Sequence, residues 1–302
     1  MAETLISPGV LARENDQSLV TAQPLVRGAA IIGPTVKGPV EKPTYVSSFS
    51  SFQAIFGGAL ESGSTDYTYL TSVAANNYFS SGGSSLLVTR VTSGSFSSAT
   101  STTIANSDTS SSFTLETISE GIIMNNDDSG AEIGNGALTS GSADNVRWEI
   151  ANVNTASGVF SLLIRRGNDN NTQKVILESF NNISLDPFSN NYISRAIGDV
   201  TSNVVVAPDG SGTYLQESGS YPNISNYVRV KQVDFNTPRY FQNDGVAKPE
   251  FTSSLPILGS GSFDTALGSN LNSFTPNLFN EKISGTNTQG LIGTNYTDAI
   301  NL

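Results

Sequence analysis

Apolar and polar residues alternate most regularly in the middle of the chain. Val146, Trp148 and Ile150 are separated by Arg147 and Glu149. Successive side chains of a strand point to opposite faces, so this pattern predicts a strand with one apolar face. Similar alternation recurs in two later segments, and turn-forming sequences separate the three: residues 160–164 and 174–178, with turns at 152–158 and 167–171. The pattern therefore predicts an antiparallel meander with one buried face.

Other short apolar runs predict further strands: residues 28–33, 85–91, 113–118, 203–207 and 227–231. The first two are almost uninterrupted apolar runs, which predicts buried strands. The 92–112 and 125–143 stretches are rich in Ser, Thr, Asn and Gly, and we expect linkers or exposed loops there. After about residue 244 the pattern becomes weak.

Two helices are predicted between these first strands. Ser48 can cap a short helix that Gly57 and Gly58 end, and its apolar residues are Phe49, Phe52, Ile55 and Phe56. A second helix should begin near Thr65 or Asp66 and end at Gly82. Its apolar stripe consists of Tyr67, Leu70, Ala74 and Tyr78, at helical spacing. A third, short helix is expected within residues 189–197, with Tyr192, Ile193 and Ala196 on one side.

These elements predict a multidomain α+β protein. Strand, helix and strand in succession indicate a small α/β layer over residues 25–92, preceded by an extended arm over residues 1–24. A Ser/Thr/Gly-rich insertion follows at 93–143, then an antiparallel β domain at 144–240 and an irregular segment at 241–302. The insertion should face outward, because its loops are polar, long and poorly patterned.

Composition narrows the classes of function. The formal net charge is −11, which disfavours direct binding to nucleic acid. The chain has no Cys and no His, which excludes disulfides, Cys/His zinc sites and Ser-His or Cys-His nucleophiles. The first residues do not resemble a signal peptide, and no run approaches the roughly 20 apolar residues that span a bilayer.

Candidate ligand sites are weak. Residues 125–130 and 168–171 are rich in oxygen ligands and could hold Ca²⁺, but neither has EF-hand spacing, and ordinary turns are the favoured interpretation. The adjacent acids Asp127 and Asp128 do not come from separate elements, as paired catalytic carboxylates do. Arg165 and Arg166 form the densest basic spot, and contact with nearby carboxylates is favoured over phosphate binding. Trp148 is expected in the β core. We assign no catalytic residue, metal ligand or cofactor.

Several segments, in order, resemble the N-terminal part of contractile tail sheath proteins of myovirus-type, T4-like bacteriophages. The first is ISPGV at residues 6–10, with Glu14 following, and the second is GAAIIGPTVKGP at residues 28–39. The others are residues 46–57, 86–91, 146–150, 158–167, 176–187 and 191–193. Each stretch alone is weakly specific, whereas their order and spacing over residues 5–240 make the combination strong.

The resemblance implies a non-enzymatic structural subunit. Sheath subunits form stacked hexameric rings around a tail tube and contract to drive the tube through the host envelope. The implied partners are further copies of the chain, the tail tube protein, and baseplate and tail terminator proteins, without nucleic acid or membrane insertion. The implied location is the virion tail, after assembly in the host cytoplasm.

Terminal arms in this family link neighbouring subunits by adding a strand to a neighbour's sheet. The candidate linking residues are Ile6, Pro8, Gly9, Val10 and Glu14. Family members are usually much longer, so the resemblance implies that the tube-facing surface and a C-terminal arm lie beyond Leu302.

Three alternatives stay open. The sheath of a contractile bacteriocin is one, although the Ser/Thr-rich insertion favours a phage. A β-rich tail adhesin or glycan-binding module is the second, for which clustered exposed aromatic residues are expected. The third is a glycan depolymerase, which the absence of a convergent catalytic motif disfavours.

Overall fold

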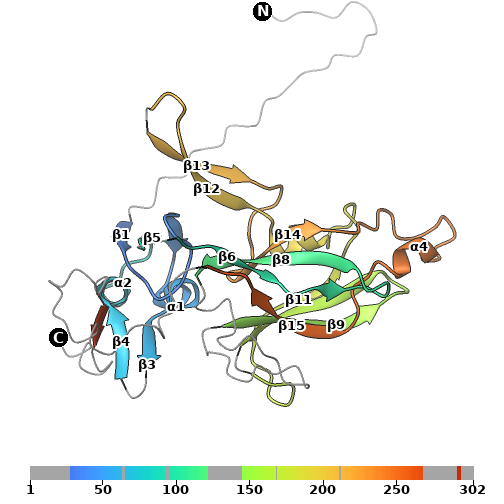
Figure 1. Ribbon diagram of the computed structural model, residues 1–302, viewed down its shortest axis with the longest axis horizontal. Coiled ribbons are helices and arrows are strands. Elements are labelled where there is room, and N and C mark those ends of the chain that lie inside the picture. Colours follow the sequence, from blue (N-terminus) through green and yellow to red (C-terminus); the bar gives the residue numbers. More distant parts are fainter. Residues whose placement is uncertain are drawn as a thin grey trace, which may run out of the picture.

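The computed structural model describes residues 28–62, 65–92, 95–121, 145–167, 169–210, 212–267 and 291–293. The fold is α+β, as predicted, with mostly antiparallel sheets and few, short helices. A small helix-covered sheet lies beside a large β sheet, and a two-stranded hairpin projects from the body (Figure 1). Two separate clusters of buried apolar side chains form the cores of the small and the large sheet.

The small sheet has three strands in the order β1 (Ala29–Gly33), β5 (Leu86–Arg90) and β2 (Thr44–Val46). β1 is parallel to β5 and β2 is antiparallel to it. Helices α1 (Phe49–Phe56) and α2 (Leu70–Ser80) contribute to the core of this layer. Its buried members are Val46, Phe52, Phe56, Ala75, Leu86 and Val88. The predicted α/β layer is therefore present.

Helix α1 has the predicted ends. The Ser48 side chain accepts a hydrogen bond from the Ser51 amide at 3.1 Å, which satisfies one of the free amides of the first turn. At the other end Gly57 has φ 76°, a conformation that favours glycine. Phe52 and Phe56 are fully buried.

The predicted start of the second helix is wrong. Residues 65–69 instead form β4 (Thr65–Tyr69), which pairs with β3 (Ala59–Ser62) and β16 (Leu291–Gly293). Helix α2 begins only at Leu70, and its buried residues are Thr71, Ser72 and Ala75, while Leu70 is 44% exposed. Strand pairing with residues distant in sequence overrides the local helical spacing and shifts the buried face.

The first strand is less buried than its composition predicts. One face of β1 packs on the helices, whereas Ile32 on the other face is 73% exposed. Leu87 of β5 and Tyr45 of β2 pair across this same outer face and are also exposed. Burial therefore applies to one face of the small sheet only.

The large sheet contains eight strands, in the order β11-β10-β9-β15-β6-β8-β14, with β7 added to β8. Their bounds are β6 Ser98–Ser101, β7 Ile104–Ala105, β8 Ser111–Glu120, β9 Val146–Asn154, β10 Val159–Arg166, β11 Ile176–Ser184, β14 Val228–Val233 and β15 Gly259–Asp264. The predicted antiparallel meander is confirmed as β9, β10 and β11. The sheet curls: the rings of Phe113 in β8 and Phe160 in β10 stack at 5.6 Å, although three strands separate β8 from β10.

Two expectations about irregular structure are wrong. Within 92–112, β6 and β7 are ordered strands, and Ala99 and Ile104 are buried. Beyond residue 241, β15 lies in the middle of the large sheet and pairs with both β9 and β6. β6 and β15 are short and consist mainly of Ser, Gly, Ala and Thr, so their own sequence carries little apolar signal. The expected domain boundaries lie near residues 143 and 240, and β15 pairs across both of them, with β6 and with β9. The domain boundaries therefore stay a prediction.

The remaining elements connect to the large sheet. Helix α3 (Ile193–Ile197) confirms the short helix and buries Ile193 and Ile197. Helix α4 (Pro249–Thr252) is a single turn. Among the described strands β12 (Thr201–Val206) pairs only with β13 (Thr213–Ser218). The sequence predicts a strand over residues 203–207, which is confirmed as β12, but it does not predict β13. Among the described helices none is long and apolar enough to cross a membrane.

Candidate functional site

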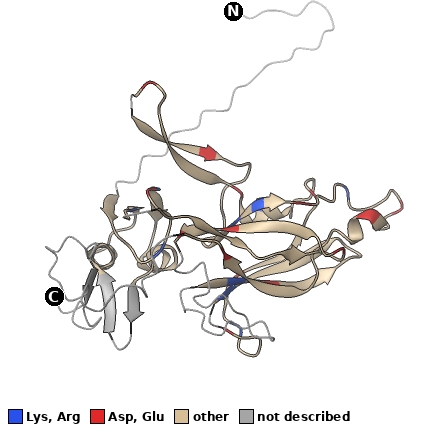
Figure 2. Ribbon diagram, viewed as in Figure 1, with Lys and Arg blue, Asp and Glu red and all other residues tan. Residues whose placement is uncertain are grey.

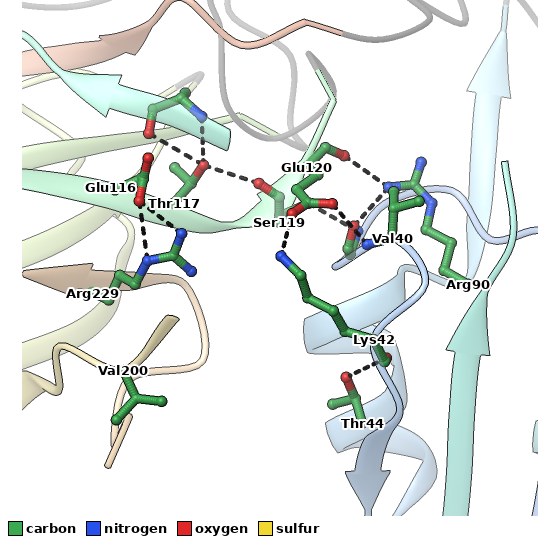
Figure 3. Close-up of polar contacts among 12 residues, drawn as sticks. Val40, Lys42, Thr44, Arg90, Glu116, Thr117, Ser119, Glu120, Val200 and Arg229 are labelled. Atoms are coloured by element: carbon green, nitrogen blue, oxygen red, sulfur yellow. Dashed lines mark hydrogen bonds and ion pairs between the residues drawn. The ribbon is translucent and has the colours of Figure 1, made fainter. Parts of the chain in front are cut away.

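The predicted linking residues Ile6, Pro8, Gly9, Val10 and Glu14 lie outside the described residues. What the described chain brings together is a polar junction between the small and the large sheet. It joins the loop after β1, the end of β5 and the end of β8 (Figure 3).

Arg90 is the centre of this junction. It is the last residue of β5, and the strand alternation that buries Leu86 and Val88 also points Arg90 inward. One of its guanidinium nitrogens donates 2.7 Å hydrogen bonds to the carbonyls of Gly38 and Glu120. The first carbonyl belongs to the small layer and the second ends β8, so one side chain joins two cores (Figure 3).

The loop over residues 38–42 completes the contact with β8. The Gly38 amide donates to the Ser119 hydroxyl at 2.8 Å, and the Glu120 amide donates to the Gly38 carbonyl at 3.1 Å. The Glu120 carboxylate accepts from the Val40 amide and forms an ion pair with Lys42. Backbone and charged groups therefore both fix this loop to the end of β8.

Burial changes the acid–base properties at the junction. It lowers the pKa of Arg90 to about 10, an effect that interactions with Tyr69 and Glu120 partly oppose. It also raises the pKa of Tyr69 to about 12, with the Arg90 charge acting in the other direction. Arg90 is nevertheless charged and Tyr69 neutral at neutral pH, which suits a permanent structural contact.

A cavity of about 280 Å³ adjoins the junction. One side of it is made by the loop before β2 and by Tyr45, and the other by Val200, Ser202 and the loop before β14. Its two cations are already paired, Lys42 with Glu120 and Arg229 with Glu116 at 2.7 Å. Both cations in the cavity walls are therefore engaged in ion pairs within the chain.

A second polar cluster lies on β9 and β10. Arg147 and Arg165 are fully buried, so the opposite face of the predicted meander is covered here as well. Arg165 makes two 2.8 Å hydrogen bonds to the Asp169 carboxylate and one to Glu149, while a guanidinium nitrogen of Arg147 lies 3.9 Å from the same aspartate. The predicted contact of Arg165 with carboxylates is confirmed.

The same cluster contains Asp169 and Asn171, two oxygen-bearing residues of the candidate calcium segment 168–171. Both carboxylate oxygens of Asp169 and the amide oxygen of Asn171 accept hydrogen bonds from Arg165. The Asp169 carboxylate thereby neutralises the guanidinium. The candidate at 125–130, including Asp127 and Asp128, lies outside the described residues. In the described ranges no three acidic, His or Cys side chains are grouped to hold a metal ion. Trp148 packs in the large core as predicted, with its indole nitrogen donating to Thr102 at 3.1 Å.

The sequence pattern does not single out Arg90, Lys42 and Glu120, which form this junction. The position of Arg90 could have been predicted from the sequence. It lies two residues after Val88 and four after Leu86, and alternate residues of a strand share one face, so Arg90 lies on their buried face. The contact between Lys42 and Glu120 could not have been predicted in this way: 78 residues separate them, and only the packing of the two sheets brings them together.

Comparison with known proteins gives little further information. No family model matches the chain, and no curated protein matches it. Among solved structures, it is similar to the crystal structure of a sheath tail protein from Desulfitobacterium hafniense, with 12% identity and a TM-score of 0.28. The similarity covers 82% of this chain and 41% of that protein. At this TM-score the likeness carries no argument about what this chain does.

Proposed function

We propose that this chain is a structural subunit of a contractile phage tail sheath. It polymerises with its own copies as stacked hexameric rings around a tail tube, and contraction of the rings drives the tube through the host envelope. The subunit is not an enzyme and uses no cofactor. Its partners are the tail tube protein and the baseplate and tail terminator proteins, and its location is the virion tail, after assembly in the host cytoplasm.

One observation carries the proposal. Sheath-like sequence segments that are far apart in the chain form one packed unit. Residues 28–39 form β1 and the junction loop, residues 46–57 include α1, and residues 86–91 include β5. Arg90 and the 38–42 loop then fix this unit to the end of β8.

The junction suits a subunit that transmits force. Contraction by rigid-body rearrangement requires each subunit to keep its shape while its contacts with neighbours change. In a contracted state that buries more surface, the free energy gained per subunit is summed over all rings. A buried, multiply hydrogen-bonded junction resists shear between the two cores better than a flexible linker would.

Electron microscopy tests the proposal. We expect negative-stain images of the purified gene product to show tubes or stacked rings. A variant lacking residues 1–24 should form fewer and shorter tubes, because it lacks the linking arm. Compact monomers or trimers at high concentration and several salt conditions would overturn the sheath assignment.

The adhesin alternative is supported by one surface. Phe188 is exposed, and Tyr192, four residues further along the chain, forms an edge-to-face pair with Tyr221. Exposed aromatic rings are what a glycan-binding module would present. Binding of host surface glycans by a compact trimer, without tube formation, would favour this function over the sheath.

A further inference from the structure

Among the described strands, β12 and β13 pair only with each other. The twelve paired residues of this hairpin run in unbroken register from Thr201 opposite Ser218 to Val206 opposite Thr213, and none of them is buried. An isolated two-stranded hairpin is marginally stable in water and usually needs a further strand or another packing surface. The hairpin projects from the body, with only its base beside the loop that precedes β2 (Figure 1).

One face of the hairpin has the composition of a contact surface. Val204 lies opposite Leu215, and Val206 is two residues along the same face. These three aliphatic side chains are exposed, Val206 by 68%. Glu217, opposite Ser202, adds a carboxylate to this face and has no ion pair among the described residues.

The charge of the hairpin has a single sign. Residues 199–219 contain three acidic residues, Asp199, Asp209 and Glu217, and no Lys or Arg. Figure 2 shows acidic and no basic colour over this element. A chain of net charge −11 repels its own copies, so a contact between copies needs a local basic surface.

Such a surface exists near the base of the hairpin. Arg195 stacks on the Tyr221 ring at 5.3 Å and Arg239 on the Phe188 ring at 5.5 Å. Tyr192 extends the first stack, because its ring contacts Tyr221, and its hydroxyl donates to Asn236, three residues before Arg239, at 3.1 Å. In the part of the chain that the structure describes, neither arginine pairs with a carboxylate, whereas most other cations do. We call these residues, Phe188, Tyr192, Arg195, Tyr221 and Arg239, the arginine–aromatic surface.

We propose that the β12–β13 hairpin of one copy docks on the arginine–aromatic surface of the next copy. The inference rests on the proposed self-assembly and names the surfaces that carry it. Aliphatic side chains of the hairpin cover the aromatic rings, and Glu217 lies against the unpaired arginines. Arginine and aromatic residues are enriched at the centres of protein interfaces, where such groups dominate the binding energy.

The contact is head-to-tail. The two surfaces differ, so each copy can give its hairpin to one neighbour and receive a hairpin from another. Such a heterologous contact closes into a ring or continues as a helix, depending on the rotation between copies. Six-residue strands reach about 20 Å, enough to extend from one subunit body to another.

Charge reversal in a complementary pair tests the inference. One variant carries Arg195→Glu with Arg239→Glu, and the other carries Glu217→Lys. Sedimentation of each pure variant at low ionic strength should show self-association weakened at least about tenfold. An equimolar mixture should associate again with 1:1 stoichiometry, because the lysine introduced by Glu217→Lys lies against the glutamates introduced in the other variant. Asp108→Lys is the control for Glu217→Lys, since it makes the same change of charge at an exposed loop and should associate like the unmodified chain.

The outcomes separate the two proposals. Unmodified chain that stays monomeric at every concentration overturns both the self-assembly and this contact. Unmodified association that survives in either variant overturns the contact alone. Weakened variants that do not recover in the mixture show that the two surfaces do not bind each other, which also overturns it.

Discussion

The guanidinium of Arg90, at the end of β5, donates a 2.7 Å hydrogen bond to the carbonyl of Glu120, at the end of β8. The same nitrogen donates to Gly38, so the bond joins two sheets with separate apolar cores. A buried charge is tolerated because carbonyl dipoles solvate it in place of water. The pair makes the two cores one mechanical unit.

Arg90→Ala should uncouple the two cores. It removes the two 2.7 Å hydrogen bonds that Arg90 donates to carbonyls in the junction, at a cost of about 3 kcal/mol. We expect urea unfolding, monitored by tryptophan fluorescence and circular dichroism, to separate into two transitions, since Trp148 lies in the large core only. Lys231→Ala is a control, because its half-exposed ion pair with Glu116 should contribute under about 1 kcal/mol. Coincident transitions in Arg90→Ala would contradict the mechanical role.

Gly38→Ala should destabilise the small layer. Gly38 has φ 111°, and an added Cβ would lie 2.6 Å from the Phe56 ring, so both backbone strain and overlap oppose the substitution. We expect a loss of about 2 kcal/mol or more in thermal or urea unfolding. Gly82→Ala is the matched control, because Gly82 also has positive φ but open space around it, and its loss should be only about 1 kcal/mol. Equal losses would show that packing against Phe56 does not matter.

Asp169→Asn should destabilise the large sheet strongly. The substitution keeps the size of the side chain but removes the buried carboxylate that faces Arg165 and Arg147. Removing one partner of a buried ion pair costs about 3–5 kcal/mol. Lys174→Ala breaks a more exposed pair with Glu149 and should cost under about 1 kcal/mol. A chemical unfolding midpoint unchanged in Asp169→Asn would contradict this interpretation.

Alkaline pH should reveal the burial of Tyr69. The pKa of Tyr69 is about 12 in the folded chain against 10.0 ordinarily. The contribution of the neutral phenol to the free energy of unfolding is therefore complete below pH 10 and declines as the pH rises toward 12. The full loss is on the order of 2 kcal/mol. Arg90 acts oppositely over the same range, because its pKa is lowered to about 10 and the folded chain releases that proton first. Tyr69→Phe should therefore gain stability relative to the unmodified chain between pH 10 and 12. Parallel stability curves would contradict the burial of the phenol.

The sequence by itself determined the elements whose signal is local. Ser48 and Gly57 set the ends of α1 through a side-chain cap and a positive φ, and alternation set the β9–β10–β11 meander. It also predicted the α+β class and the core position of Trp148. These features depend on neighbours a few residues apart, which a pattern along the chain records.

Only the tertiary structure decided the rest. β15 and β6 have little apolar character and are strands because other strands flank them, and β4 replaces the expected first turns of α2 because β3 and β16 pair with it. Likewise Lys42 meets Glu120, and Arg239 is left beside Phe188 without a carboxylate, through folding alone. The free energy of such contacts depends on residues far apart in the chain, which no local period can encode.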